Sequence, residues 1–147
     1  MPFEIFKFKG DTDPEEGGAP IGVIDLEDRS MEIHTKIPIK VLAAAYTFVA
    51  EDTGTFFKCT AALTLTLPAV SAAFKGCHLW VFVAADVTVV IAATADEMIT
   101  FNDVDADQIT WSTSSEKTGA AAHIICDGTA WMIMLMTEET QTTTVTT

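Results

Sequence analysis

The chain has 147 residues, with 21 acidic side chains against 8 Lys and Arg, and its formal net charge is −13. That balance excludes nucleic acid as a partner, because phosphate binding needs basic side chains to replace counterions, and it argues against an anionic membrane surface. Hydrophobic residues make up 49% of the chain, yet no uninterrupted apolar stretch reaches the roughly 18 residues that suggest a membrane span. The apolar excess therefore belongs in a β core or in contacts between subunits.

The length fits one compact domain with extensions, which buries a core without disulfides or metals. The first residues, MPFEIFKFKGD, lack the basic start, long apolar middle and cleavage site of a signal peptide. Cys59, Cys77 and Cys126 are odd in number, have no paired spacing and lie in apolar, strand-like runs. We expect buried free thiols and therefore a reducing compartment.

Residues 1–40 are expected to form an arm and a linker rather than a core. Apolar and charged side chains mostly alternate over residues 3–9, which favours a short strand or an extended arm. Residues 10–20 are rich in turn formers and acids, and Pro38 prevents residues 37–39 from forming a central strand. The arm either lies over another surface or forms an edge hairpin of the main domain. The side chains expected to contact a partner are Phe3, Ile5, Phe6, Phe8, Ile21, Val23, Ile24 and Ile33.

From residue 41 the pattern is that of β-strands. Residues 63–67, LTLTL, alternate strictly and predict one apolar and one polar face. Residues 79–83, LWVFV, and 87–91, VTVVI, are apolar runs typical of strands that are covered on both faces. The short joint at residues 84–86 predicts a hairpin between these two runs.

Further strands are expected toward the C-terminus. Residues 98–101 and 108–111 are separated by the acidic segment NDVDAD, which predicts a turn. Asp127-Gly128 between two apolar runs is a strong hairpin signal. The run WMIMLM at residues 131–136 is so apolar that we expect both of its faces to be covered. We favour a central strand there over a strand at a subunit contact, where Met would adapt to the shape of the partner.

These patterns predict an all-β fold over residues 41–137, with an extended N-terminal arm. The domain is expected to be a small antiparallel β-barrel or a jelly-roll-like sandwich. Residues 138–147 form a Thr-rich tail with almost no apolar content. We expect this tail to be disordered alone or extended along a partner.

A calcium loop is one candidate site, because Asp103, Asp105 and Asp107 form D-x-D-x-D. The rest of the loop is missing. Gln108 stands where the sharp turn needs Gly, and Ser114 stands where a bidentate Glu should bind the ion. We therefore favour a solvated acidic turn.

Zinc and nucleophilic catalysis also have weak support. No C-x-x-C or H-x-x-x-H pair anchors a tetrahedral site, and the side chains of Cys77 and His78 would point to opposite faces of a strand. A Cys–His pair needs only spatial proximity, but no motif around any Cys supports one. We therefore expect His34, His78 and His123 to be structural, and we expect no metal and no cofactor.

Enzyme motifs are missing from the sequence, which contains no G-x-S-x-G, P-loop or Rossmann fingerprint. No pair of carboxylates lies in a recognisable glycosidase context. Trp80, Trp111 and Trp131 could form a sugar-binding platform, but each lies in an apolar run where core packing is the commoner fate. We expect no enzymatic activity and name no catalytic residue.

Several segments, in order, resemble a β-rich module of tailed-phage virion proteins. Residues 46–54, YTFVAEDTG, are similar to its entry strand and turn, and residues 64–68, TLTLP, match its "T-hydrophobic-T-L-P" step. Gly76 precedes the strand at residues 79–83, and residues 126–131, CDGTAW, resemble its closing "S-D-G-T-x-W" hairpin. Together the matches cover about residues 45 to 135. They are most similar to head decoration, or cement, proteins and to parts of tail fibres and spikes.

The resemblance implies a noncatalytic homotrimer on the outer surface of the virion, assembled in the host cytoplasm. It would bind the major capsid protein at threefold or quasi-threefold positions, tie neighbouring capsomers together and stabilise the mature head. In this family an N-terminal arm commonly strengthens the grip on capsid or on a neighbouring subunit, and here that arm would be about residues 2–40. Glu51 departs from the small residue usual in the first turn, and the arm matches no pattern, so the capsid partner stays open.

Two alternatives remain. The chain could be a tail-fibre or spike module that binds a host glycan, although it has no triple-repeat or coiled-coil shaft. It could also be a small β-barrel hydrolase or a cupin-like metal protein, for which its three His are few.

Overall fold

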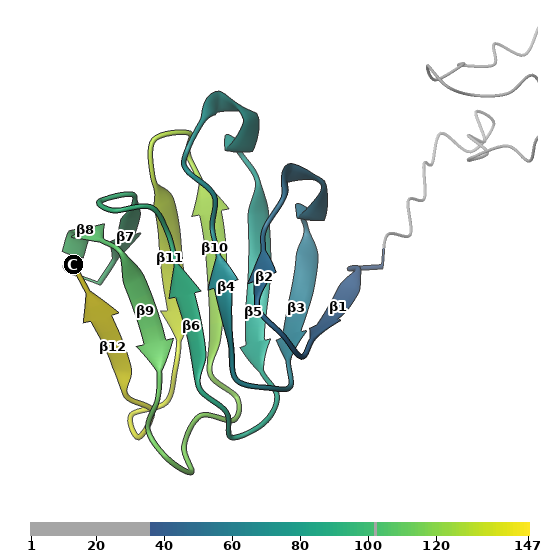
Figure 1. Ribbon diagram of the computed structural model, residues 1–147, viewed down its shortest axis with the longest axis vertical. Coiled ribbons are helices and arrows are strands. Elements are labelled where there is room, and N and C mark those ends of the chain that lie inside the picture. Colours follow the sequence, from purple (N-terminus) through teal and green to yellow (C-terminus); the bar gives the residue numbers. More distant parts are fainter. Residues whose placement is uncertain (1–35, 102) are drawn as a thin grey trace, which may run out of the picture. The chain divides into compact units, whose positions relative to one another are not determined.

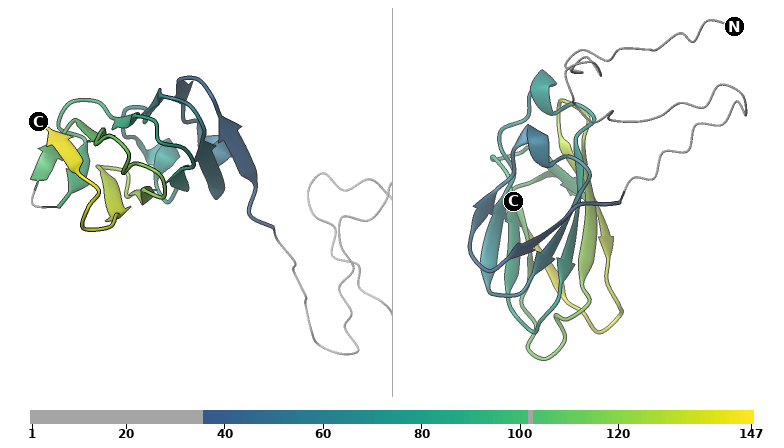
Figure 2. Two further views of the ribbon diagram at one scale, coloured as in Figure 1. Left: turned by 90° about the horizontal axis from the view of Figure 1, so that it is seen from below. Right: turned by 90° about the vertical axis from the view of Figure 1, so that its right-hand side faces the viewer.

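Two β-sheets packed against each other make up residues 36–101 and 103–147, which are the residues that the computed structural model describes. The first sheet has seven strands in the spatial order β1 (Ile39–Leu42), β3 (Thr55–Cys59), β5 (His78–Val83), β10 (Ala121–Cys126), β11 (Trp131–Met136), β7 (Met98–Thr100) and β8 (Asp103–Ala106). The second has five, in the order β12 (Thr143–Thr146), β9 (Gln108–Trp111), β6 (Val89–Ala92), β4 (Leu63–Thr66) and β2 (Tyr46–Thr47) (Figure 1). Figure 2 shows the sheets as two layers. The prediction of an all-β fold is confirmed, and of the two predicted architectures, barrel and sandwich, the structure is a sandwich.

The first six strands wind around the core as a coil. β1, β3 and β5 are neighbours in the seven-stranded sheet, β2, β4 and β6 are neighbours in the five-stranded sheet, and the chain changes sheets after each strand. Neighbours within each series run parallel, and so do β7 and β11. The expected antiparallel pairing is found at β5–β10, β10–β11, β7–β8, β6–β9 and β9–β12. Both sheets are therefore mixed rather than purely antiparallel.

The hairpin predicted at residues 84–86 is wrong, because β5 and β6 lie in different sheets. Asp86 in this joint is held by groups much later in the chain. Its carboxylate accepts the backbone N–H of Ser115 at 2.9 Å and pairs with the Nζ atom of buried Lys117 at 2.9 Å. The hydrogen bond from Lys117 is the main cause that lowers the pKa of Asp86. These nonlocal contacts fix the joint as a crossing between the sheets.

The hairpin predicted at Asp127-Gly128 is confirmed, because β10 and β11 pair on either side of it. The Oδ1 atom of Asp127 accepts the backbone N–H groups of Thr129 at 2.7 Å and Ala130 at 2.8 Å. Hydrogen bonds from Thr129 hold the pKa of Asp127 below its usual value, and the bond from the Thr129 hydroxyl has the largest effect. Gly128 has φ of +96°, a conformation that favours glycine. The D-G-T motif therefore has a structural role in this turn.

Two segments expected to lack regular structure form edge strands. Residues 143–146 of the Thr-rich tail form β12, which pairs with β9. Within the acidic segment, Asp103–Ala106 forms β8, which pairs with β7. Thr has a high β propensity, and an edge strand tolerates charged side chains because its outer side is open to water. Low apolar content therefore did not prevent either segment from pairing.

The core lies between the sheets and contains the inward side of each strand. Trp131 belongs to an aromatic cluster in the core: its ring meets Phe48 edge-on at 5.6 Å between centroids and Phe74 at 5.8 Å. The Nε1–H group of Trp131 donates to the carbonyl oxygen of Pro68 at 2.9 Å. This bond joins β11 to the end of the TLTLP segment, across 63 residues of sequence.

The three cysteines are free and buried, as the sequence predicted. Burial raises the pKa of Cys59 to about 11 and is also the main cause that raises the pKa of Cys126. A thiol with a raised pKa is a poor nucleophile near neutral pH.

The proposed arm contacts, from Phe3 to Ile33, fall within residues 1–35, outside the described part of the chain. β1 begins directly after Pro38 and lies at the edge of its sheet, as the sequence predicted for this proline.

Replacing Trp131 should strongly destabilise the sandwich. Trp131→Phe leaves the Pro68 carbonyl without its donor and should cost about 1–3 kcal/mol in the free energy of unfolding, and Trp131→Ala should cost about 3–5 kcal/mol. Trp80→Phe, on the outward side of β5, is the control and should change stability by less than about 1 kcal/mol. Urea unfolding followed by circular dichroism measures all three. Equal losses for Trp131→Phe and Trp80→Phe would contradict the assigned role of Trp131.

Candidate protein interaction site

The candidate functional site is the outward side of five neighbouring strands of the seven-stranded sheet, from β1 to β11. On β5, Leu79 and Val81 point inward and are fully buried, whereas the residues between and beside them point outward. The strand register carries this alternation across β1, β3, β10 and β11. We call the outward side of these five strands the apolar face. It consists of Ile39, Val41, Phe56, Lys58, His78, Trp80, Phe82, Ala121, His123, Ile125, Met132, Met134 and Met136.

The apolar face has two exposed margins. On the β1 margin, Ile39 is 68% exposed and Val41 is 60% exposed. On the β11 margin, Met134 is 49% exposed and Met136 is 46% exposed. The strands between them, β3, β5 and β10, carry outward aromatic side chains that are half-buried by their neighbours. Large hydrophobic side chains are therefore most accessible at the two sides of the face.

Rings pack against one another at the centre of the apolar face. His123 stacks on Trp80 with 3.9 Å between centroids and 6° between ring planes. His78 meets His123 edge-on, and the Nε2 atom of His123 lies 3.4 Å from the Nδ1 atom of His78. Phe56 and Phe82 pack at 5.9 Å between centroids. These contacts order the centre of the face before any partner binds.

The turn that ends YTFVAEDTG supports His78 from the side. The Oγ1 atom of Thr53 accepts the backbone N–H of His78 at 3.1 Å, and the N–H of Gly54 donates to the His78 carbonyl oxygen at 2.8 Å. Gly54 has φ of +80°, so a side chain here would be strained. This motif therefore positions the histidine end of β5.

The outward side of the five-stranded sheet has different side chains from the apolar face, although both sheets follow the same alternation of inward and outward residues. Its residues follow the same alternation and register, but hydroxyls replace the large apolar groups. We call it the threonine face. It consists of Thr47, Thr64, Thr66, Val90, Ala92, Gln108, Thr110, Thr144 and Thr146. Hydroxyls bond readily to water, so the threonine face suits a solvated surface, whereas the apolar face does not.

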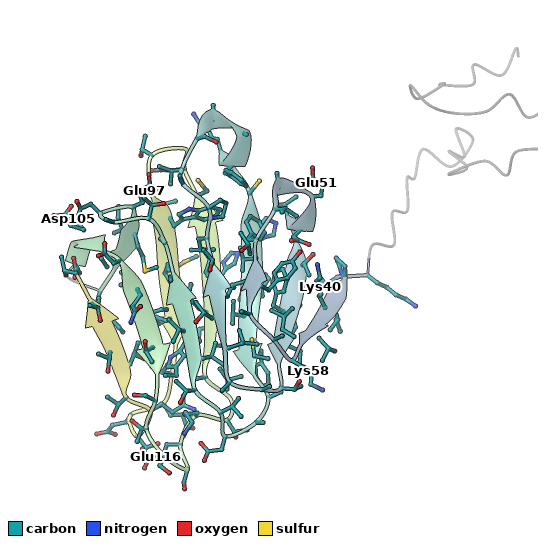
Figure 3. The ribbon with its side chains drawn as sticks, viewed as in Figure 1. Lys40, Glu51, Lys58, Glu97, Asp105 and Glu116 are labelled. Atoms are coloured by element: carbon teal, nitrogen blue, oxygen red, sulfur yellow. The ribbon has the colours of Figure 1, made fainter. Side chains whose placement is uncertain are left out.

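The acidic side chains avoid both faces. Among the described residues, the acidic side chains that lie on strands are those of Asp103 and Asp105, and both belong to the edge strand β8. In Figure 3, Glu51 and Glu97 lie at one end of the sandwich and Glu116 at the opposite end. Lys58 is the one residue of the apolar face that is Lys, Arg, Asp or Glu. The five strands of the apolar face thus carry no carboxylate, and Asp103 and Asp105 lie two strands beyond β11 in the same sheet.

The sequence contained a sign of the apolar face that we interpreted differently. Residues 79–83 and 131–136 are apolar at both odd and even positions, which we took to mean that both sides are covered, and for residues 131–136 we favoured a central strand over a strand at a subunit contact. β11 is indeed a central strand, as predicted, but its outward methionines are exposed. Trp111 and Trp131 are buried as expected, whereas Trp80 lies on the apolar face.

The candidate metal residues are already engaged with the protein. The Oδ1 atom of Asp103 accepts the backbone N–H of Asp105 at 3.0 Å, its Oδ2 atom accepts the hydroxyl of Thr147 at 2.7 Å, and the Oδ1 atom of Asp107 accepts the N–H of Asp96 at 2.8 Å. Within residues 36–101 and 103–147, no group of three or more His, Cys, Asp or Glu is arranged to hold a metal ion.

A polar network closes the corner beside β1. The Nζ atom of Lys40 donates to the hydroxyl of Tyr46 at 2.5 Å and lies 3.3 Å from Oδ1 of Asp52, and the Tyr46 hydroxyl donates to Oδ2 of Asp52 at 2.6 Å. The hydrogen bond with Tyr46 is the main cause that raises the pKa of Lys40. This network ties β1, β2 and η2 (Ala50–Asp52) together and so holds the edge of the apolar face.

A hollow of about 530 Å³ lies beside the end of β11, next to the apolar face. Its lining residues are Thr118, Gly119, Met136, Thr137, Glu138 and Gln141. The Nε2 atom of Gln141 donates to the carbonyl oxygen of Thr118 at 3.0 Å, which joins two of these lining residues. Among the helices of the described residues, none is long and apolar enough to cross a membrane.

No family model and no curated protein matches this chain.

His123 should titrate below the ordinary histidine value of 6.5, because burial and, second, the neighbouring His78 lower its pKa. The unfolded chain then binds more protons in the window between the two pKa values, so stability falls as the pH drops from 6.5 through the folded pKa. NMR titration measures this pKa directly. His78→Gln should raise the pKa of His123 by removing the second cause, while burial of His123 continues to lower it. A pKa at or above 6.5 in the unaltered protein would contradict the packing described for this ring.

Proposed function

We propose that this protein is a noncatalytic structural protein of a tailed-phage virion. It binds the major capsid protein at threefold or quasi-threefold positions on the outside of the head as a homotrimer, and it stabilises the mature head. The apolar face carries the proposal, because a broad apolar surface on an acidic chain marks contact with other protein subunits, as in an assembled virion. The resemblance of the strand, turn and hairpin motifs to decoration proteins supports the same function.

The positions of those motifs support a scaffold rather than a reaction centre. Thr53 and Gly54 hold β5, and Asp127 organises the turn between β10 and β11. Each of these strands belongs to the apolar face. The residues that carry the resemblance therefore position the strands of the apolar face.

The charge distribution fits assembly on a repeating lattice. A net charge of −13 keeps free subunits soluble and apart from packaged DNA. A trimer that engages several equivalent capsid sites binds much more tightly than one subunit does, so each contact need only be modest. Docking on a basic capsid site would also weaken as salt rises.

The alternative of a glycan-binding fibre module has less support. A platform of three tryptophans does not form, because Trp111 and Trp131 are in the core and one side of the Trp80 ring is covered by His123. Stacking on sugars needs an open aromatic surface. Binding on a glycan array, lost in Trp80→Ala, would favour this alternative.

Cosedimentation with phage heads tests the proposal. We expect saturable binding to expanded heads, at a stoichiometry that matches their threefold sites, and no binding to unexpanded heads. Lysozyme serves as a sedimentation control for trapping by the pellet. Absence of binding to both head forms would contradict a decoration function.

Deleting residues 2–20 should weaken head binding while leaving the sandwich folded. The deletion removes Phe3, Ile5 and Phe8, which can add a strand to a sheet edge, and none of the residues that make the described core. Circular dichroism checks the fold, and cosedimentation compares the affinities at equal concentration. Unchanged affinity would show that the arm does not contribute to binding.

A further inference from the structure

We infer that the apolar face is covered by a second copy of this chain, with the β1 margin of one copy against the β11 margin of the next. The inference builds on the proposed trimer, and it assigns the surface through which its copies touch. It is tested without phage heads, so its failure is distinguishable from failure of the decoration function.

Charge favours a second copy as the occupant. Two copies that each carry a net charge of −13 repel each other, and the repulsion is strongest where carboxylates meet. The apolar face has no carboxylate. Its single lysine, Lys58, is basic and is therefore attracted by the net negative charge of a second copy. Like copies can therefore approach through this side with the least repulsion.

The contrast between the two sheets argues in the same direction. The threonine face and the apolar face belong to one sandwich and follow the same alternation, yet one presents hydroxyls and the other presents Trp, Phe, Ile and Met. A freely soluble monomer has no need for this difference, because Thr is equally compatible with a strand. Contact with protein accounts for the apolar side chains.

Exposure within the face indicates how copies would be arranged. The accessible apolar side chains lie at the margins, with Ile39 and Val41 on one side and Met134 and Met136 on the other, while the centre is partly closed by its own rings. In a ring of three, each copy uses two different surfaces, one toward each neighbour. The two margins supply those surfaces, and flexible Met side chains adapt to the branched Ile and Val.

The size of the face shows how far a contact between copies must extend. Five strands spaced about 4.8 Å apart and about six residues long cover roughly 24 by 20 Å, or on the order of 500 Å². A standard interface buries about 800 Å² on each partner. The contact must therefore extend past the face at its margins, where exposed Ile37 continues the β1 side.

Light scattering on the purified full chain gives the first test. We expect a trimer, and we expect Met134→Lys or Ile39→Lys to shift it to monomers, with association weakened on the order of 100-fold by an uncompensated charge in the contact. Thr66→Lys is the matched control, since Thr66 is also exposed and outward on an interior strand, but on the threonine face. It should stay trimeric.

Cysteine cross-linking tests the arrangement. The double variant Val41→Cys with Met134→Cys should form covalent trimers under mild oxidation, whereas Val41→Cys alone should not cross-link, and the buried native thiols provide a low background. Covalent dimers from Met134→Cys alone would overturn the assigned pairing of margins, because they require like margins to meet.

Two further results would overturn the proposal. The first is a monomer that binds a hydrophobic dye at the apolar face, which would mean that the face is open for a different protein. The second is a monomer whose dye binding increases when residues 1–35 are removed, which would mean that the chain covers its own face. Equal loss of association in Thr66→Lys and Met134→Lys would also contradict the assignment.

Discussion

The shared core between the two sheets is the constraint on which the rest of the structure depends. The sheets have different strand numbers and mixed strand directions, and they are held together by inward side chains such as Phe48, Leu65 and Trp131. Because alternate residues of a strand point to opposite sides, filling the core fixes which residues point outward. The apolar face follows directly from the positions of Leu79 and Val81, which place Trp80 and Phe82 on the other side.

The local pattern allowed the strands to be predicted but not their assignment to sheets. The alternation at residues 63–67 correctly predicted inward Leu and outward Thr, and Asp127-Gly128 correctly predicted a hairpin. The joint at residues 84–86 has the length and composition of a hairpin, yet the contacts of Asp86 with Ser115 and Lys117 set its course. Such contacts are invisible to a reading of neighbouring residues. Parallel pairing was missed for the same reason, since its partners are far apart in sequence.

The apolar face was not predicted from the sequence. Sequence reasoning placed partner contacts in the arm, all within residues 1–35, which lie outside the described part of the chain, so those contacts stay a prediction. Apolar residues at both odd and even positions of β5 and β11 could have identified the apolar face. A strand that is apolar on both sides is consistent with burial inside a domain or with burial by another subunit. The choice between them requires knowing what lies above the sheet, which only the packing of the whole chain reveals.

The two outward faces differ in polarity in a way that would suit the proposed assembly. Carboxylates lie at the ends of the sandwich and hydroxyls on the threonine face, where they favour contact with water, and the apolar face is the surface to which we assign contact between copies. Methionine oxidation, located by mass spectrometry across a dilution series, tests this central claim most directly. The account predicts that Met134 and Met136 are protected at high protein concentration and become oxidised on dilution, while Met98 in the core stays protected. Rapid oxidation of Met134 and Met136 at every concentration would contradict it.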